Sequence, residues 1–217
     1  MSGIDPRPSL TERRKAATQQ EIALAAARLF ARRGAEATTA EDIAREAGVS
    51  LRTFYRYFRA KEDAVAPLLA DGVRQWIGLL SAEPAGLTSP EALERSARAA
   101  FGPTAHRPAE ALEWTRGLLR VMAGDPGLQA VWHRVHHESE LALTPVLAEL
   151  AGPAADPLEI RLAAAAASTG MRIAVETWAA TDDPTDQVPD LAARCVGELT
   201  RGLRLWGRHP SDPHGPS

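Results

Sequence analysis

Hydrophobic and polar positions along this chain repeat mainly with the spacing of amphipathic helices. The first apolar stripe recurs at i, i+4, i+7 and i+8 and consists of Ile22, Ala26, Leu29 and Phe30. Ser9 and Glu12 have the spacing of a capping box, and Gly34 can end a helix in the left-handed conformation. The pattern therefore predicts a helix from residue 10 to about Arg33.

Two shorter helices joined by a glycine turn are predicted between Thr39 and Phe58. Thr39 is a good N-cap, and Asp42 follows three residues later, where its carboxylate can bond back to the cap. Gly48 provides the permissive backbone that the turn needs, and Ser50 can cap the second helix. This order of elements is that of a helix-turn-helix.

The second short helix is predicted to have an apolar side and a polar side, because successive residues advance by about 100°. The inward side carries Leu51, Phe54 and Phe58, and the outward side carries Arg52, Tyr55 and Arg56, flanked by Thr53 and Tyr57. Such an outer surface suits the major groove of DNA. A solvated charged surface over a small core is the alternative. The turn chemistry and the inward aromatic pair favour the helix-turn-helix.

The remaining pattern also predicts helices, so the expected fold is all-α with nine or ten helices. They are expected at 61–80, 91–101, 109–123, from 126 to beyond 146, 157–180 and 188–206. Asp125-Pro126 and Asp156-Pro157 are start signals, because proline suits the first position of a helix. Pro67 is expected to bend the first of these helices and Pro145 to kink the fourth. Residues 1–9 are expected to form a flexible arm and residues 207–217 a disordered tail.

Positive charge is concentrated near the N-terminus. The net charge of the 217 residues is −3, but residues 1–60 carry 11 Lys or Arg against 7 Asp or Glu, and the rest carry 14 against 21. A basic N-terminal region followed by an acidic body predicts nucleic acid binding at one end only. The single Cys195 excludes an internal disulfide framework and fits a reducing cytosol. With no apolar signal segment and no uncharged run of about 20 residues, we expect a soluble, cytoplasmic protein without a membrane partner.

The segment Ala25 to Ala64 resembles the DNA-binding domain of the tetracycline-repressor (TetR) family of bacterial transcription regulators. The features that carry the resemblance are L-F-x-x-x-G, T-T-x-x-D-I-A, A-G-V-S, T-F-Y-x-Y-F and K-E-D. Ala60 departs from the family, which more often has a capping Ser or Asn there. The resemblance implies a DNA-binding domain at 10–64 and a ligand-binding and dimerisation domain at 65–206. It also implies a homodimer, most often a repressor, on a palindromic operator.

Nine residues are the predicted DNA contacts, taken from the outer helix surface and from the resemblance. Thr39 and Lys61 are expected on phosphates. The complete set is Thr39, Ser50, Leu51, Arg52, Thr53, Tyr55, Arg56, Tyr57 and Lys61.

The stretch 114–203 loosely resembles the C-terminal domain of a TetR subfamily that binds acyl-CoA-like ligands. The matching features are R-x-x-x-x-D-P-G-L-Q, I-R-L-A-A-A-A and E-T-W. The resemblance implies a small apolar effector, and a long apolar molecule with an anionic end is the first expectation. The alternative is that these large side chains are core. The predicted ligand contacts are Trp114, Met122, Trp132, His133, His136, Met171, Arg172 and Trp178.

A cluster of polar side chains raises a metal hypothesis. It consists of His133, His136, His137, Glu138 and Glu140, and the histidine spacing can place two imidazoles on one side of a helix. No third ligand is assured and the H-E-x-x-H signature is absent. Polar lining of a pocket, or a solvated surface, is the preferred interpretation, and neither a metal nor a cofactor is expected.

Catalytic signatures are absent from the sequence, so no enzyme is expected. It contains no G-x-S-x-G elbow, phosphate loop or Rossmann glycine pattern. The rival function is a DNA-independent metal-binding or interaction protein.

The last two helices, 158–180 and 189–206, are the predicted dimer interface. Two helices from each subunit can bury their apolar stripes against one another. The alternative is that the chain's own core uses these stripes completely. The residues concerned are Leu162, Ala166, Ile173, Leu191, Val196, Leu199 and Leu203.

Overall fold

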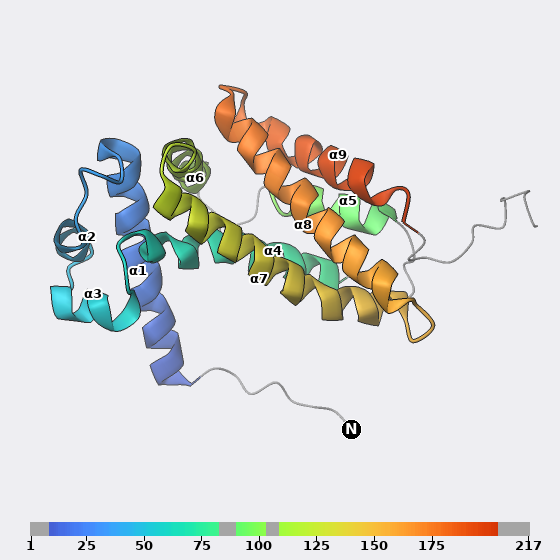
Figure 1. Cartoon of the computed structure of the whole chain (residues 1–217), viewed down its shortest axis with the longest axis horizontal. Helices are drawn as coiled ribbons and strands as arrows, with labels where there is room; N and C mark the ends of the chain where they lie inside the picture. Colours follow the sequence, from blue (N-terminus) through green and yellow to red (C-terminus); the bar gives the residue numbers. More distant parts are fainter. Residues whose placement is uncertain (1–8, 83–89, 103–108, 204–217) are drawn as a thin grey trace, which may run out of the picture. The chain divides into compact units, whose positions relative to one another are not determined.

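The structure is a computed structural model that describes residues 9–82, 90–102 and 109–203 (Figure 1). In these ranges the chain forms nine α-helices and two 3-10 helices and contains no strand. The predicted all-α class is therefore confirmed. The predicted arm, apart from residue 9, and the predicted tail lie outside the described residues.

The first helix, α1 (Leu10–Arg33), begins as the sequence predicts. The Glu12 N–H donates to the Ser9 hydroxyl at 3.2 Å, and the Ser9 N–H donates to the Glu12 carboxylate at 2.7 Å. These bonds form the complete capping box and satisfy N–H groups that an α-helix leaves without partners at its start. At the other end Gly34 has φ 78°, the left-handed region that favours glycine.

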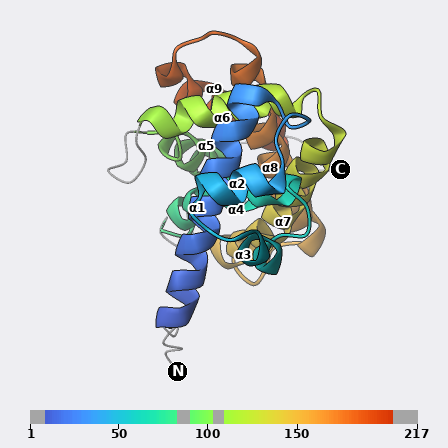
Figure 2. The ribbon, with the colours of Figure 1, turned by 90° about the vertical axis from the view of Figure 1, so that its left-hand side faces the viewer.

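Two short helices follow, α2 (Ala40–Glu46) and α3 (Leu51–Tyr57), and α2 lies across α1 (Figure 2). The shared core holds fully buried apolar side chains from all three helices: Ile22, Leu29, Phe30, Ile43 and Phe54. The α3 residue of this set is the aromatic Phe54, and α2 contacts both α1 and α3. This packing fixes which side of α3 remains exposed.

The next helix differs from the prediction at its start. A short 3-10 helix, η1 (Glu62–Val65), precedes α4 (Ala66–Ser81), so Pro67 is the second residue of α4 rather than an interior one. Proline in the first turn removes no helical hydrogen bond, because that N–H has no acceptor within the helix. The predicted interior position of Pro67 was therefore wrong, and the reason for expecting a bend there is removed. The Ala60 N–H donates to the Asp63 carboxylate at 3.2 Å, and Lys61, at the N-cap of η1, makes no side-chain cap bond.

The remaining helices are α5 (Pro90–Ala99), α6 (Ala109–Met122), α7 (Pro126–Ala151), α8 (Pro157–Ala180) and α9 (Val188–Thr200), with η2 (Thr185–Gln187) before α9. Both Asp-Pro start signals are confirmed. Asp125 accepts from the Leu128 N–H and Asp156 from the Leu158 N–H, each at 2.9 Å. The last helix ends at Thr200, short of the predicted residue 206, and Gly202, a poor helix former, follows.

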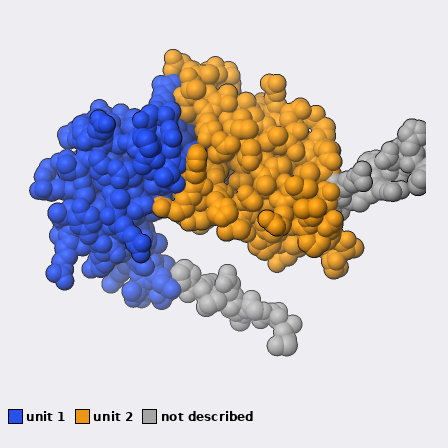
Figure 3. Space-filling view, in the orientation of Figure 1, with its two compact units in different colours: residues 1–69, 117–132 blue, residues 70–116, 133–217 orange. Residues whose placement is uncertain are grey.

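The chain divides into two compact units (Figure 3). One comprises residues 1–69 and 117–132, and the other comprises residues 70–116 and 133–217. Each unit therefore consists of two stretches that are separate in the sequence. The expected domain boundary between residues 64 and 65 stays a prediction.

In the second unit, α8 and α9 pack side by side at close range (Figure 1). Gly170 makes this possible, because a Cβ at that position would lie 2.8 Å from the Cα of Val196. Trp76 is in the same core and donates its indole N–H to the Ser96 hydroxyl at 3.0 Å. Within the described ranges, no helix is both long enough and apolar enough to cross a membrane.

Candidate functional site

The turn between α2 and α3 is held by local hydrogen bonds. The Thr39 hydroxyl accepts from the Asp42 N–H, and the Asp42 carboxylate accepts from the Thr39 N–H, both at 3.1 Å. The Thr39 hydroxyl also donates to Asp42 at 2.8 Å, and this bond is the main reason that the pKa of Asp42 is lowered. Gly48 has φ 66°, and the Ser50 hydroxyl caps α3 by accepting from the Thr53 N–H at 3.1 Å. The predicted helix-turn-helix caps are confirmed.

The outer side of α3 carries the polar side chains expected there. Arg52, Tyr55 and Arg56 are exposed, whereas Phe54 is completely buried. Phe58, just after the helix, is 6 % exposed and lies 5.5 Å from Phe54 between ring centroids. A polar surface on an aromatic base is the arrangement that the sequence predicted.

Leu51 does not follow the prediction. It was assigned to the inward side, but it is 40 % exposed. Leu51 is the first residue of α3, one turn ahead of the part of the helix that packs through Phe54. The helical angle placed it correctly around the axis, but the core does not extend to that end. Its exposure leaves it available for the DNA contact that was also predicted for it.

Two outward residues of α3 are already oriented by neighbours. The Arg56 guanidinium lies 5.0 Å from the centroid of the Tyr57 ring, and its Nη2 is 3.4 Å from the Tyr57 hydroxyl. The Ser50 and Thr53 hydroxyls are 2.9 Å apart. Side chains held this way lose less rotamer freedom when they bind a partner.

Lys61 has a structural contact that sequence reasoning did not foresee. Its ammonium donates to the Ala35 carbonyl at 2.6 Å and lies 3.8 Å from the Glu62 carboxylate. Lys61 thereby ties the segment after α3 to the loop after α1. Its predicted phosphate contact stays a prediction.

The eight predicted ligand contacts do not gather around one cavity. His133, His136 and Arg172 line a cavity of about 330 Å³ between α7 and α8, whereas Trp178 lines another of about 660 Å³. Met171 is buried in the core of the second unit, and Trp114 is half-buried there. Met122 and Trp132 are buried in the first unit. Their roles as ligand contacts stay predictions.

The smaller cavity, which we call the histidine cavity, is lined by His133, His136, His137, Glu140, Ser168, Thr169 and Arg172. Burial, then the positive charges of Arg172 and His133, lower the pKa of His136 to about 4. The Ser168 hydroxyl donates to the His136 carbonyl at 3.4 Å, and Arg172 pairs with Glu176 at 2.9 Å. Sequence reasoning missed Ser168 and Thr169, whose only signal was two hydroxyls in an alanine-rich helix.

The histidine cavity gives no support to a metal site. Among the residues that the structure describes, no group of three or more His, Cys, Asp or Glu is placed to hold a metal ion. The metal-binding form of the rival function therefore has no geometric basis in this part of the chain.

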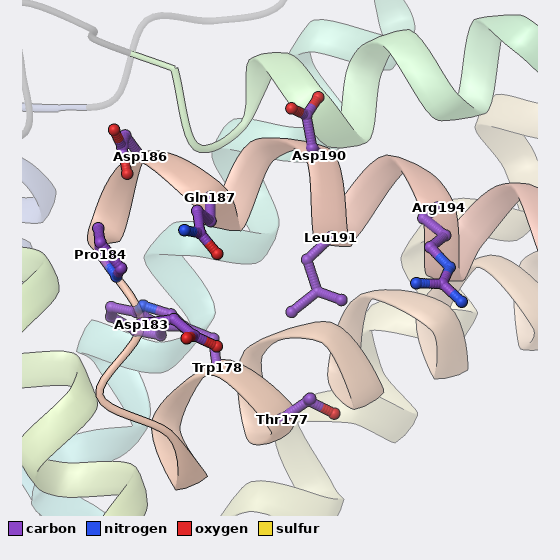
Figure 4. Close-up of a pocket in the computed structure, with 9 residues that line it drawn as sticks. All are labelled: Thr177, Trp178, Asp183, Pro184, Asp186, Gln187, Asp190, Leu191 and Arg194. Atoms are coloured by element: carbon purple, nitrogen blue, oxygen red, sulfur yellow. The ribbon is translucent and has the colours of Figure 1, made fainter.

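The larger cavity, which we call the α8–α9 groove, lies between the end of α8 and the start of α9 (Figure 4). Leu191 and Arg194 extend from α9 toward α8, where Thr177 lies opposite them. The Arg116 guanidinium stacks 4.2 Å from the Trp178 ring and donates to the Asp183 carbonyl. Of these groove residues, sequence reasoning singled out only Leu191 and Trp178. Most of the others lie at helix ends and in a turn, where periodicity gives no signal, and Arg194 is an exposed polar residue within α9.

The helices that border this groove expose the apolar residues expected at a dimer interface. Of the predicted residues, Leu162 and Ile173 of α8 are exposed, and Leu199 of α9 is 42 % exposed. Leu158, which was not in the predicted set, is also exposed. Ala166, Leu191 and Leu203 are half-buried. Val196 is an exception, because it is completely buried beneath Gly170. Its assignment to an interface with a second copy was wrong.

Comparison with known families gives two separate matches. Residues 22–66 match the family described as "Bacterial regulatory proteins, tetR family", and residues 91–204 match the "MftR C-terminal domain". The first match contains the helix-turn-helix. The second covers more than half of the chain.

Similar individual proteins point to the same fold. The HTH-type transcriptional regulator TcmR of Streptomyces glaucescens is 29 % identical over 147 residues, which are 67 % of this chain but 65 % of TcmR, less than two thirds of that relative. A TetR-family structure from Mesorhizobium loti has a TM-score of 0.55 at 22 % identity and covers 87 % of this chain and 97 % of its own. The TetR family repressor AlkX from Dietzia sp. has a TM-score of 0.52 at 20 % identity, covering 84 % and 95 %.

Proposed function

Because this chain belongs to the TetR family of bacterial regulatory proteins, we propose that it is a transcriptional regulator that binds operator DNA through α3. The observation that carries the proposal is the exposed Arg52, Tyr55 and Arg56 surface on the buried aromatic base of Phe54 and Phe58. A helix presented in this way can enter the major groove while its back stays fixed. Arginine can then bond the two acceptors of guanine.

We propose that the other predicted DNA contacts surround this surface of α3. Thr53 and Tyr57 flank it, Leu51 extends from its start, and Thr39 and Lys61 contact phosphates. Phosphate contacts fix the position of the helix, and base contacts select the sequence.

We propose that the regulator is a homodimer formed by α8 and α9. Leu162, Ile173 and Leu199 are apolar and exposed in the single chain. They lie on α8 and α9, the two helices that also line the α8–α9 groove (Figure 4). A second copy placed with two-fold symmetry would cover the same residues on both subunits. Two copies of α3 would then read a palindromic operator.

We propose that a small molecule controls DNA binding. The effector is apolar with an anionic end, acyl-CoA-like in the first instance. The loose resemblance of the body supports the apolar part, and the polar cavity with Arg172 supports the anionic end. Such a molecule releases DNA only if it binds the DNA-incompetent state more tightly, since equal affinity for both states shifts nothing.

The test is selection of bound sequences from random DNA by the full chain. The expected result is a palindrome with half-sites about 10 base pairs apart or slightly more. No enriched sequence, or a single unpaired half-site, would contradict the proposal or its dimer. Acyl-CoAs of increasing chain length are then titrated into the operator complex. If none weakens it while a cationic or aromatic drug does, the acyl assignment fails.

A further inference from the structure

The histidine cavity has an unusual balance of chemical groups. Its α7 wall carries His133, His136, His137 and Glu140, which recur at i, i+3, i+4 and i+7 and therefore share one side of the helix. Its α8 wall carries Ser168, Thr169 and Arg172. One guanidinium, three imidazoles and two hydroxyls thus face a single carboxylate. The cavity is rich in hydrogen-bond donors and poor in negative charge.

Arg172 is the fixed positive charge of this cavity. Its Nη1 donates to the Glu176 carboxylate at 2.9 Å, one turn further along α8, and its side chain is about one third exposed. A guanidinium has five N–H donors in a planar fork, so one bond to Glu176 uses a small part of its capacity. The pair holds the Arg172 side chain along α8 at the cavity wall.

His136 lies on the opposite wall in an environment that keeps its imidazole neutral. Burial of the side chain is the largest cause of its lowered pKa, and the charges of Arg172 and His133 lower the pKa further. Glu140 and His137 line the same cavity, and Glu176 neutralises part of the charge of Arg172. Burial and these two positive charges therefore disfavour an added proton on His136. A negative group placed inside would offset the two charges.

We infer that the histidine cavity binds the anionic group of a small ligand, a carboxylate or a phosphate. Arg172 and the Thr169 hydroxyl are the donors, and His136 takes up a proton as the anion binds. Arginine is well suited to both anions, because its two parallel N–H groups match their oxygens. A cavity of about 330 Å³ is at the small end of ligand sites, so it holds one head group.

This inference specifies which group of the proposed effector is bound and where. It rests on the proposed function only for the claim that anion binding regulates the protein. Anion binding can be measured without DNA. Proton uptake distinguishes specific binding in the cavity from nonspecific screening of the protein's charges by salt. Affinity should rise as pH falls from about 7 toward 5, because the bound anion stabilises the imidazolium of His136.

The test is isothermal titration of the full chain, without DNA, with inorganic phosphate and with acetate at constant ionic strength in chloride. Repeating it in two buffers that differ in ionisation heat counts the protons taken up. We expect a saturable heat that Arg172→Gln weakens by about tenfold or more. His136→Gln should abolish proton uptake and keep part of the affinity. Arg161→Gln, which alters an exposed arginine on the same helix outside the cavity, is the matched control and should change nothing.

The titration results distinguish between the possible anions and between the roles of the variants. A preference for phosphate or for acetate identifies the head group, and Arg172→Lys, which keeps the charge without the planar fork, should bind with intermediate affinity. Helicity and the unfolding midpoint of each variant show whether its fold is intact. No saturable heat, or equal heats in wild type and a folded Arg172→Gln, would overturn the inference while leaving operator binding untouched. A chain that binds phosphate but selects no DNA would refute the proposed function alone.

Discussion

Arg52 and Arg56 are both exposed on α3, but their surroundings differ. Arg56 rests over Tyr57, so part of the entropy of ordering this long side chain is already lost before DNA is bound. In the proposed complex either arginine can bond a guanine, which presents two acceptors in the major groove. The identity of the bases that α3 selects therefore depends on these two side chains more than on the total positive charge.

Replacing either arginine should weaken operator binding and relax selectivity. We expect Arg52→Ala or Arg56→Ala to cost about 1–3 kcal/mol if that arginine reads a base. The measurement is fluorescence anisotropy with the selected operator at fixed salt. Arg161→Ala, which removes an equal charge from α8, is the control. Unchanged affinity in both α3 variants, with their fold intact, would refute the assigned surface.

His136 links the stability of the fold to pH. Its pKa is about 4 in the folded chain and about 6.5 when unfolded, so the unfolded state binds the proton more readily between these values. Stability from this group is fully present above about pH 6.5 and is lost as pH falls toward 4. We expect a loss of about 2 kcal/mol between pH 7 and pH 5.

Urea unfolding at the two pH values measures this loss. His136→Gln should remove the part of the pH dependence that belongs to this imidazole. His137→Gln is the comparison, because its side chain is on the same helix but exposed. If His136→Gln loses as much stability on acidification as wild type, the buried neutral imidazole is not the cause.

At the scale of helices, α8 and α9 have two different apolar surfaces. One packs inside the chain, with Val196 beneath Gly170, and the other is exposed through Leu162, Ile173 and Leu199. A helix that is apolar on both sides needs two neighbours. The internal neighbour is present in the single chain, and the proposed second copy would supply the other.

A glutamate placed on the exposed surface should affect dimerisation, whereas one placed on the buried surface should affect folding. We expect Leu199→Glu to give a folded monomer, because residue 199 is exposed in the single chain, and Val196→Glu to unfold the chain, because it buries an unpaired carboxylate. Sedimentation velocity reports mass and circular dichroism reports folding. A Leu199→Glu protein that remains dimeric would place the interface elsewhere.

Two glycines on helices should respond oppositely to alanine. At Gly170 the new Cβ would meet the backbone of Val196 at 2.8 Å, so α8 and α9 would have to separate, and we expect a loss of about 1–3 kcal/mol. At Gly78 nothing lies within 4 Å, so Gly78→Ala should gain about 0.5–1 kcal/mol from helix propensity. Urea unfolding of both variants checks the pair. Equal effects would mean that close helix contact is not the function of Gly170.

For the molecule as a whole, the features that short-range chemistry controls were predictable. The caps at Ser9, Thr39, Ser50, Asp125 and Asp156 bond groups a few residues apart, and all were read correctly. The errors concern long-range packing. Periodicity predicts on which side of a helix a residue such as Leu51 or Val196 lies. It does not predict whether another part of the chain covers that side. The histidine cavity was only partly predictable. His133, His136 and Arg172 were predicted ligand contacts, whereas Ser168 and Thr169 line the cavity only because α8 lies against α7.

Charge and dimerisation together determine how salt should affect DNA binding. Residues 1–60 carry an excess of 4 positive charges, whereas the rest carry an excess of 7 negative ones. Contacts to phosphates are therefore expected from the N-terminal part alone. Each neutralised phosphate contributes about −0.9 to the slope of log affinity against log salt.

A dimer on a palindrome makes these contacts twice, so its slope should be about double that of one subunit. The Leu199→Glu monomer should accordingly bind the operator more weakly and with about half the slope, while its helix-turn-helix is unchanged. Anisotropy titrations across a range of salt concentrations measure both quantities. Arg56→Ala in the dimer is the contrasting case, because loss of a base contact lowers affinity with little change in slope. A monomer with the full slope would mean that one subunit makes all the phosphate contacts, which the two-fold arrangement does not allow.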